Sequence, residues 1–278
     1  MIISGSVVLY KTDEADVRRV IESFGPISAN RKLYLIDNSP EISMGFGGTP
    51  GVEYVHVAAN IGYGKAHNIA LQKAIEGGSK YHTILNPDIE FSPCLLDELV
   101  RYAERHCDVV NIMPKIVYPN GNLQFLCKKA PTPFIMLGRY FFLKSRRFAA
   151  LNARFELRDS GYATIMNPPI LSGCFMFLRI SAILAHSLFF DDHFFMYYED
   201  FDLNRRCHRY GRTVFYPGVT VVHRHARAAH KSLKMLIVFI RSTVIYFNKY
   251  GWIFDAERMR FNREIEAEIR EIKRCASV

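Results

Sequence analysis

The sequence predicts an α/β protein built around a mostly parallel sheet, and three observations lead to that fold class. Strand-like runs alternate with helical patterns over the first hundred residues, which is the rhythm of successive βαβ units. Of the 278 residues 49% are apolar, so the chain holds enough material for a large core. It contains only 12 prolines and 17 glycines, and this composition excludes the disordered, collagen and coiled-coil classes.

Four strands and three helices are expected before Cys107, because apolar runs bounded by turn residues alternate with apolar residues at helical spacing. The strands are predicted at Ile2 to Tyr10, Lys32 to Asp37, Val52 to Val57 and Tyr81 to Leu85, and the helices at Asp13 to Phe24, Gly64 to Ile75 and Pro93 to His106. Ligands of such sheets bind beyond the carboxyl ends of the strands. The residues that follow these strands are therefore the first candidates for a site.

The alternation breaks after Cys107. Pro-Asn-Gly-Asn at residues 119–122 predicts a hairpin turn, and the basic, aromatic residues 128–158 are expected to form an irregular loop over a site. The remaining elements are a core strand, a helix closed by Gly211, two short strands and two terminal helices, predicted at Ile170 to Leu178, Glu199 to Tyr210, Thr213 to Phe215, Val219 to His223, Leu233 to Phe247 and Ala256 to Arg274. The last helix has a balanced charge and is expected to be solvated.

The chain is basic, with 36 Lys and Arg against 27 Asp and Glu and a formal charge of +9. The excess lies in two stretches without acidic residues, 109–155 and 203–254, which together carry +18 and leave −9 for the rest. Such segregation predicts a polyanionic partner, which is a phosphate-bearing ligand, an anionic membrane surface or a nucleic acid. The six cysteines form no CxxC pair, so neither a zinc knuckle nor a disulfide framework is indicated.

No cleavable leader and no uninterrupted apolar run long enough to span a bilayer is recognisable, so we expect a cytoplasmic protein. The helix that begins near Leu233 carries an apolar stripe, and its other side mixes Lys234 and Arg241 with apolar residues. That mixture suits a helix at a membrane interface. It equally suits a helix packed on the domain with snorkelling basic side chains.

Two segments of the first half hold candidate ligands for a nucleotide. Asp37 ends the apolar strand of LYLIDNS with Asn38 beside it, where a carboxylate can accept a hydrogen bond from a base, although strand-end Asx residues also initiate turns. In NIGYGKAHNIA, Gly62 lets the backbone approach a ligand, and Lys65 and Asn68 share a helical face that can meet diphosphate or sugar oxygens. The glycines alternatively serve only the turn.

Metal chemistry is indicated at two strand ends. Asp88 follows the strand YHTIL within Asn-Pro-Asp, and a carboxylate near phosphates is a ligand that Mg²⁺ or Mn²⁺ favours. A plain turn is the alternative. His223 and His225 end a later strand on one face, and one of them would complete the metal site.

The helix EDFDLNRRCHRYG contains the candidate base. Its spacing places Asp200 on a stripe of apolar residues, whereas Asp202 shares a stripe with arginines one turn further on. We therefore expect Asp200 to face inward, with the raised pKa of a general base, and Asp202 to form salt bridges. The alternative is that Glu199 and both aspartates only complement the helix N-terminus.

The order of these motifs is more specific than any one of them. The chain resembles the inverting glycosyltransferase family 2, and within it the rhamnosyltransferase-like members of bacterial surface polysaccharide synthesis. The matching segments, which span roughly residues 3 to 251, are VVLYK, IDNS, NIGYGKAHNIA, LNPDIEF, SGCFMFLR, FDDHFFMYYEDFDLNRRCHRYG, VVHRHA and RSTVIYFNKYG. The resemblance implies a GT-A fold, with a nucleotide-binding half at about 1–107 and an acceptor-binding half at about 108–228. We expect residues 229–278 to form a helical appendage, which either associates with a membrane or packs on the domain.

Carried over to this sequence, the resemblance implies that Asp200 is the catalytic base and that Glu199 and Gly173 lie at the acceptor. The implied metal ligands are Asp88 and His223. The implied donor ligands are Tyr10, Asp37, Asn38, Asn60, Gly62, Lys65, Asn68 and Asp88. The DxD of the family appears here as Asn86-Pro87-Asp88, with one carboxylate fewer, so the expected Mg²⁺ or Mn²⁺ is weakly bound or dispensable.

The implied reaction is the inverting transfer of a sugar, with rhamnose favoured, from a dTDP- or UDP-sugar to a hydroxyl of a lipid-linked or growing glycan acceptor in polysaccharide, O-antigen or capsule synthesis. One alternative is a sugar-1-phosphate nucleotidyltransferase, which would want a glycine-rich basic loop where this chain has LYKTDEAD. The other is a non-enzymatic protein that binds an anionic surface or nucleic acid. We interpret the basic charge as serving the donor, the acceptor and the inner face of the cytoplasmic membrane, with no nucleic acid as partner.

Overall fold

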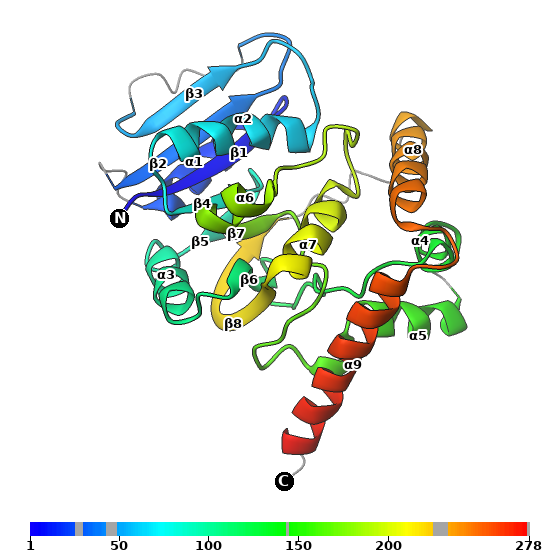
Figure 1. Ribbon diagram of the computed structural model, residues 1–278. Helices are drawn as coiled ribbons and strands as arrows, with labels where there is room; N and C mark the ends of the chain where they lie inside the picture. Colours follow the sequence, from blue (N-terminus) through cyan, green and yellow to red (C-terminus); the bar gives the residue numbers. More distant parts are fainter. Residues whose placement is uncertain (26–29, 43–48, 143–144, 225–232, 277–278) are drawn as a thin grey trace.

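The computed structural model describes residues 1–25, 30–42, 49–142, 145–224 and 233–276 (Figure 1). In these residues the chain forms one eight-stranded sheet, with strand order β3-β2-β1-β4-β7-β6-β8-β5. The strands are β1 (Ile3–Leu9), β2 (Arg31–Asp37), β3 (Val52–His56), β4 (Tyr81–Leu85), β5 (Ile89–Phe91), β6 (Val109–Val117), β7 (Phe175–Arg179) and β8 (Arg212–His223). The α/β class predicted from the sequence is confirmed.

Strand direction brings the candidate residues to one edge of the sheet. β1 to β4 pair in parallel, and β6 and β8 run in the same direction as they do. β7 is antiparallel to both β4 and β6. Its amino-terminal end, preceded by Gly173, therefore lies at the edge where β4 ends at Leu85 and β8 ends at His223.

Helices cover the sheet and extend from it (Figure 1). They are α1 (Glu14–Phe24), α2 (Tyr63–Glu76), α3 (Leu95–Arg105), α4 (Pro133–Phe141), α5 (Arg146–Phe155), α6 (Ile180–His186), α7 (Glu199–Tyr210), α8 (Leu233–Tyr250) and α9 (Ala256–Ala276), with a 3₁₀ turn at Arg158–Ser160. α7 has the bounds that the sequence predicts, and α1, α2 and α3 differ from the predicted ranges by one or two residues at their ends.

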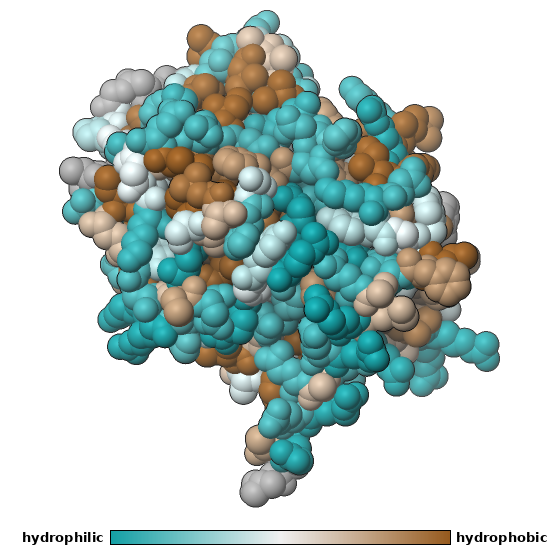
Figure 2. All heavy atoms as spheres, viewed as in Figure 1, coloured by the Kyte–Doolittle hydropathy of each residue, from teal (hydrophilic) through white to brown (hydrophobic). Residues whose placement is uncertain are grey.

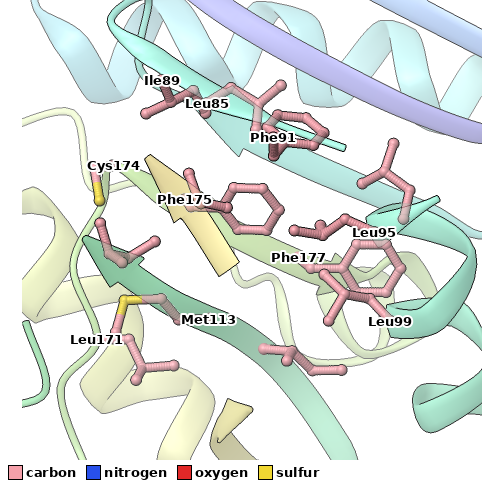
Figure 3. Close-up of a cluster of buried hydrophobic side chains, with 14 of the residues drawn as sticks. Leu85, Ile89, Phe91, Leu95, Leu99, Met113, Leu171, Cys174, Phe175 and Phe177 are labelled. Carbon is pink, nitrogen blue, oxygen red and sulfur yellow. The ribbon is translucent and has the colours of Figure 1, made fainter. Parts of the chain in front are cut away.

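The main core lies directly behind the edge that carries the candidate site. Figure 3 shows Phe175 and Phe177 of β7 on one side of the strand, with Phe91 of β5 and with Leu95 and Leu99 of α3. The Phe91 and Phe175 rings meet edge to face with centroids 5.6 Å apart. Because side chains alternate along a strand, this packing fixes the start of β7 and the loop that precedes it.

Two expectations about local structure are wrong. Residues 128–158 are not an irregular loop, because α4 and α5 form there. The Thr132 hydroxyl accepts the Ile135 N–H at 3.2 Å, and Pro133 occupies the first turn of α4. The two strands expected at Thr213 to Phe215 and Val219 to His223 are one strand, β8, whose pairing with β6 shifts in register after Tyr216. The turn expected at residues 119–122 is confirmed by the Tyr118 N–H, which donates to the Asn122 carbonyl at 2.8 Å.

The last helix is packed rather than solvated, so that expectation is also wrong. Phe261, Ile265 and Ile269 of α9 are buried, and the two isoleucines belong to the main core. Arg205 of α7 donates to Asp255 at 2.5 and 2.7 Å and to Glu257 at 2.7 Å. Buried ion pairs and apolar side chains therefore join the start of α9 to the sheet domain.

α8 packs on one side and exposes the other. Tyr246 and Phe247 are buried in a cluster that includes Ile135 of α4 and Phe148 of α5. The opposite side carries an exposed apolar stripe of Leu233, Ile237, Ile240 and Val244. Within the described residues, no helix is long and apolar enough to cross a membrane.

Candidate active site

A pocket of about 690 Å³ opens at the edge of the sheet where β4, β6 and β8 end and β7 begins. Its lining comes from segments far apart in the chain, and it includes Glu199 and Asp200 at the start of α7. The other lining residues are Tyr63, Asn86, Tyr118, Leu123, Gln124, Phe125, Leu126, Lys128, Arg139, Glu156, Arg158, Ser172, Gly173, Cys174, Met196, Tyr197 and His223. Its position agrees with the rule that ligands bind at the carboxyl ends of parallel strands.

Asp200 faces this pocket and is held by backbone groups alone. Its Oδ2 accepts the N–H of Gly173 at 3.0 Å, and its Oδ1 accepts the N–H of Phe201 at 2.9 Å. Among the described residues it forms no ion pair with Lys, Arg or His. Its carboxylate is therefore oriented but not neutralised, as a general base requires.

Glu199 and Asp200 are neighbouring acids, and the state in which both are ionised is unfavourable. Burial raises the pKa of Asp200, and burial together with the Asp200 charge raises the pKa of Glu199. Glu199 is 7% exposed, and its Oε2 has no hydrogen-bond partner among the described residues. The pair therefore readily retains one proton, which leaves one carboxylate ionised.

The predicted salt bridge of Asp202 and the raised pKa of Asp200 are confirmed, but the expectation that Asp200 is the inward-facing aspartate is wrong, because Asp202 is the more deeply buried of the two. Asp202 is completely buried and accepts hydrogen bonds from Arg206 at 2.8 Å and Tyr250 at 2.6 Å, with Lys249 also at 2.6 Å. Asp200 is partly exposed at the pocket. The reason is that α8 supplies Lys249 and Tyr250, and these partners cannot be inferred from the helical spacing of α7 alone.

A strained turn aims the two acids into the pocket. Tyr197 and Tyr198, which precede α7, both have φ of 68°, in the left-handed region that favours glycine. The Tyr198 side chain is buried against Tyr246, and its Oη accepts the Thr243 hydroxyl at 3.2 Å. Packing on α8 thus holds a backbone conformation that is unfavourable by itself.

Asp88 and His223 converge from β4 and β8. His223 Nε2 lies 3.3 Å from Asp88 Oδ1 and 3.4 Å from Asn86 Nδ2. His223 Nδ1 lies 2.9 Å from Gln124 Oε1, and Gln124 Nε2 donates to the His223 carbonyl at 2.8 Å. This orientation of Gln124 assigns the ring proton to Nδ1 and turns the Nε2 lone pair toward Asp88. A hydrogen bond from the ring nitrogen that does not face the metal is typical of metal-ligating histidines.

The donor set fits a divalent cation that also binds substrate. One carboxylate and one imidazole converge here, and Mg²⁺ is commonly held by one or two carboxylates plus substrate phosphates. No group of three or more His, Cys, Asp or Glu side chains that could hold a metal ion occurs among the described residues. His225 lies outside them.

Comparisons with known proteins bear on the fold and on the class of enzyme. No family model matches the chain. Two curated relatives are the N-acetylglucosaminyl-diphospho-decaprenol L-rhamnosyltransferases of Mycobacterium tuberculosis strains CDC 1551 / Oshkosh and ATCC 25618 / H37Rv. Each is 26% identical over 220 residues, which is 73% of this chain and 69% of the relative.

Similar solved structures include S. aureus TarS, with a TM-score of 0.57 and 14% identity over 95% of this chain and 43% of that one. TarS 1–349 in complex with UDP-GlcNAc has a TM-score of 0.56 and 13% identity, over 95% of this chain and 71% of that one. GalNAc-T7 with UDP, GalNAc and Mn²⁺ has a TM-score of 0.61 and 14% identity, over 95% of this chain and 54% of that one. The chain thus spans about half the length of TarS and of GalNAc-T7.

The chain is a glycosyltransferase with a GT-A fold. The resemblance to rhamnosyltransferase-like members of family 2 is confirmed. The readings as a nucleotidyltransferase and as a non-enzymatic binding protein are not supported.

In this glycosyltransferase the NIGYGKAHNIA motif contacts the segment that leads into α7. The Asn68 side chain donates to the Phe190 carbonyl and accepts the Phe190 N–H, both at 2.9 Å. At Gly62, where φ is +95°, a Cβ would lie 2.4 Å from the Phe195 carbonyl oxygen. Asn60 Oδ1 accepts the Gly62 N–H at 3.1 Å, and Lys65 lies 4.0 Å from Asp192. The motif therefore supports the segment that leads into α7, which carries Glu199 and Asp200, and contact of the motif with a donor stays a prediction.

The residues predicted to bind the base of the nucleotide lie at the ends of β1 and β2. Tyr10 is 47% exposed, whereas Asp37 is completely buried. Asp37 accepts the Ser39 N–H at 2.8 Å and the Tyr54 hydroxyl. Asn38 donates to the Gly62 carbonyl at 3.1 Å. These contacts shape the loops after the strands, and direct contact of Asp37 with a nucleotide stays a prediction.

Several pocket residues were not singled out from the sequence, and two of them are important for the geometry and the charge of the pocket. The Tyr63 hydroxyl donates to the Gly173 carbonyl at 2.8 Å and lies 3.2 Å from Asn86 Oδ1, so it fixes the loop whose N–H orients Asp200. Burial, with nearby acids, raises the pKa of Tyr63 well above its usual value, so the hydroxyl stays protonated. The other is Lys128, which in the sequence is only one of eight basic residues in an acid-free stretch.

Proposed function

We propose that this glycosyltransferase moves a sugar, with rhamnose favoured, from a dTDP- or UDP-sugar to a hydroxyl of a lipid-linked or growing glycan acceptor, with inversion. The setting would be bacterial O-antigen, capsule or related polysaccharide synthesis. One observation carries the proposal, the pocket-facing carboxylate of Asp200, which backbone N–H groups orient and which forms no ion pair with any cation of the described residues. The relatives named as L-rhamnosyltransferases acting on a lipid-linked diphosphate sugar support this choice of substrates.

In the proposed mechanism, Asp200 accepts the proton of the acceptor hydroxyl as that oxygen attacks the anomeric carbon. The bond from this carbon to the diphosphate oxygen breaks on the opposite face, which inverts the configuration. The electron pair leaves with the nucleoside diphosphate, and Asp200 ends protonated. Glu199 and Gly173 line the pocket beside Asp200, where they would contact the acceptor. Because Glu199 retains a proton, it can donate a hydrogen bond to an acceptor oxygen.

Asp88 and His223 would hold Mg²⁺ or Mn²⁺. The cation would stabilise charge on the leaving diphosphate. Because only two protein ligands converge, we expect weak binding that the donor's phosphates complete. Chelation with EDTA should lower transfer, and Asp88→Asn should raise the Mn²⁺ concentration that restores half of the activity. Undiminished turnover in EDTA would remove both residues as ligands.

For the donor, we propose that the loops after β1 and β2 hold the nucleotide. Tyr10 is exposed there and would stack on the base of the nucleotide. Asp37 and Asn38 hold the loops that would form the bottom of this site. The loop before α2, with Asn60 and Gly62, would face the sugar diphosphate. Lys65 and Asn68 would act from the first turns of the same helix.

We further propose that the protein binds the cytoplasmic face of an anionic membrane through α4, α8 and the turn before α9. Exposed apolar side chains gather there, and Figure 2 shows hydrophobic residues over α8. They are Phe134, Leu137, Leu233, Ile237, Ile240, Val244, Trp252, Ile253 and Phe254. Stretches 109–155 and 203–254, which contain α4 and α8, lack acidic residues, and each basic group near anionic lipid contributes about 1 kcal/mol.

Vesicle co-sedimentation tests the membrane proposal. Binding to phosphatidylglycerol-containing vesicles should fall strongly in the double variant Ile237→Asp and Ile240→Asp. Leu184→Asp is the matched control, because Leu184 is 55% exposed on α6, a helix outside this surface. Equal loss in both variants, or none in either, contradicts the assignment.

The transfer reaction itself is tested with a panel of nucleotide sugars and two acceptors, water and a synthetic N-acetylglucosaminyl diphosphate with a short alkyl chain. We expect transfer from dTDP-rhamnose to the diphosphate acceptor, with an anomeric configuration opposite to that of the donor by NMR. A retained configuration contradicts the mechanism. If the protein transfers sugar only from a different donor, the assignment of rhamnose is replaced, and the proposed mechanism and acceptor are unaffected.

A further inference from the structure

Lys128 is a buried cation without a charged partner. It is only 9% exposed, yet its Nζ forms no hydrogen bond or ion pair with any described residue. The Phe201 ring centroid lies 5.5 Å from Nζ. The side chain is buried, but its Nζ is not among the fully enclosed atoms that lack a partner, so the three donors of the ammonium are reached from the pocket. A side chain in this state, on the wall of a pocket, indicates a ligand that supplies acceptors.

The surroundings of Lys128 are fixed and positively charged. Its backbone pairs with Ile170, so the side chain starts from a rigid position. Arg139 donates to Glu156 at 2.7 Å, and Arg158 donates to the same carboxylate at 2.6 Å. One acid thus faces two guanidinium groups and the ammonium, so this wall keeps a net positive charge. Burial, with the Arg139 charge, lowers the pKa of Lys128.

This basic wall lies on the acceptor side of the pocket. Asp200, which would take the acceptor's proton, is close enough to Lys128 for each charge to affect the other's pKa. Arg139 belongs to α4, and the same helix exposes Phe134 and Leu137. An anionic group bound at Lys128 would therefore lie between the catalytic carboxylate and an exposed apolar surface.

We propose that Lys128, with Arg139 and Arg158, binds a phosphate or diphosphate group attached to the acceptor sugar. This inference rests on the proposed function, because it names the acceptor's anionic group as the ligand. The geometry matches a molecule with a sugar at one end, a diphosphate next to it and a lipid chain beyond.

A comparison of two acceptors distinguishes binding of the acceptor's phosphate by Lys128 from a general effect on catalysis or on folding. One is N-acetylglucosamine joined to a short alkyl chain through diphosphate, and the other is the uncharged alkyl glycoside with the same chain. In Lys128→Met, the preference in kcat/KM for the diphosphate acceptor should fall roughly tenfold or more, because a charge-assisted hydrogen bond is lost. Lys128→Arg should keep most of it. Lys129→Met is the matched control, because Lys129 pairs with Glu266 outside the pocket.

Inorganic pyrophosphate gives a second, independent measurement. Titration calorimetry with saturating nucleoside diphosphate, which occupies the donor site, should detect pyrophosphate binding that Lys128→Met loses and Lys129→Met retains. Equal slowing with both acceptors, or a change confined to the donor's KM, overturns the proposal. If the wild-type protein transfers sugar to neither acceptor, the proposed function fails and the titration alone decides the role of Lys128.

Discussion

Two faces of α7 carry carboxylates only two residues apart, and their surroundings differ completely. Asp202 is buried and bonded to Arg206, Lys249 and Tyr250. Asp200 lies at the pocket, and within the described part of the chain it accepts hydrogen bonds only from backbone N–H groups. One aspartate therefore ties α7 to α8, and the other keeps the lone pairs and charge that a base needs. Available partners, rather than burial alone, distinguish a structural acid from a catalytic one.

The largest effect should come from Asp200→Asn. Loss of the general base should lower kcat by about a thousandfold, because an amide cannot take the acceptor's proton. The side-chain shape is kept, so the melting temperature and the Kd for the nucleoside diphosphate should stay close to wild type. Transfer kinetics measure kcat, and titration calorimetry measures the Kd for the nucleoside diphosphate. Turnover near the wild-type rate would falsify the assignment of Asp200 as the base.

Asp202→Asn should show the reverse pattern. It weakens a buried network with Arg206, Lys249 and Tyr250, so the free energy of unfolding should fall by about 3 kcal/mol. Urea unfolding measures this change. Activity per folded molecule should remain within a few-fold of wild type at low temperature. A normal stability with a large loss of kcat would reverse the roles given to the two aspartates.

Gly173→Ala is a smaller change that acts on the Asp200 face only. A Cβ at residue 173 would lie 3.0 Å from the Asp200 Cβ, closer than ordinary contact, so the carboxylate must shift by a few tenths of an ångström. We expect a roughly tenfold loss of kcat with little change in stability. A stability loss as large as that of Asp202→Asn would show that the loop before β7 supports the core instead of the base.

Much of the fold could be predicted because its signals are local. α7 ends at Gly211 as expected, and the first four strands are apolar runs bounded by turn residues. α4 and α5 were missed because tertiary packing supports them. Phe148 of α5 packs so close to α4 that a Cβ at Gly138 would lie 2.1 Å from its ring, and this contact between two short helices cannot be inferred from the sequence of either helix alone.

The site was predictable only where chemistry follows a strand or opens a helix. Asp88 and Asp200 are of this kind, and His223 meets Asp88 in the structure. Tyr63 and Lys128 were missed because their importance depends on partners more than forty residues away, such as Gly173 and Asp200. Such residues come close together only in the folded chain. For the same reason, the sequence of α7 alone did not predict that Asp202 is buried against α8.

The smallest effect concerns pH. Burial raises the pKa of Asp200, whereas the Lys128 charge lowers it. A base acts when deprotonated, so kcat should fall on acidification at a pH above the usual range of an aspartate. Lys128→Met removes the opposing charge, so the pKa of Asp200 should rise further and the acidic limb of the pH–rate profile should move to higher pH. Lys129→Met should leave the limb in place. A limb that Lys128→Met does not move, measured with the uncharged acceptor, would place Lys128 too far away to influence the base.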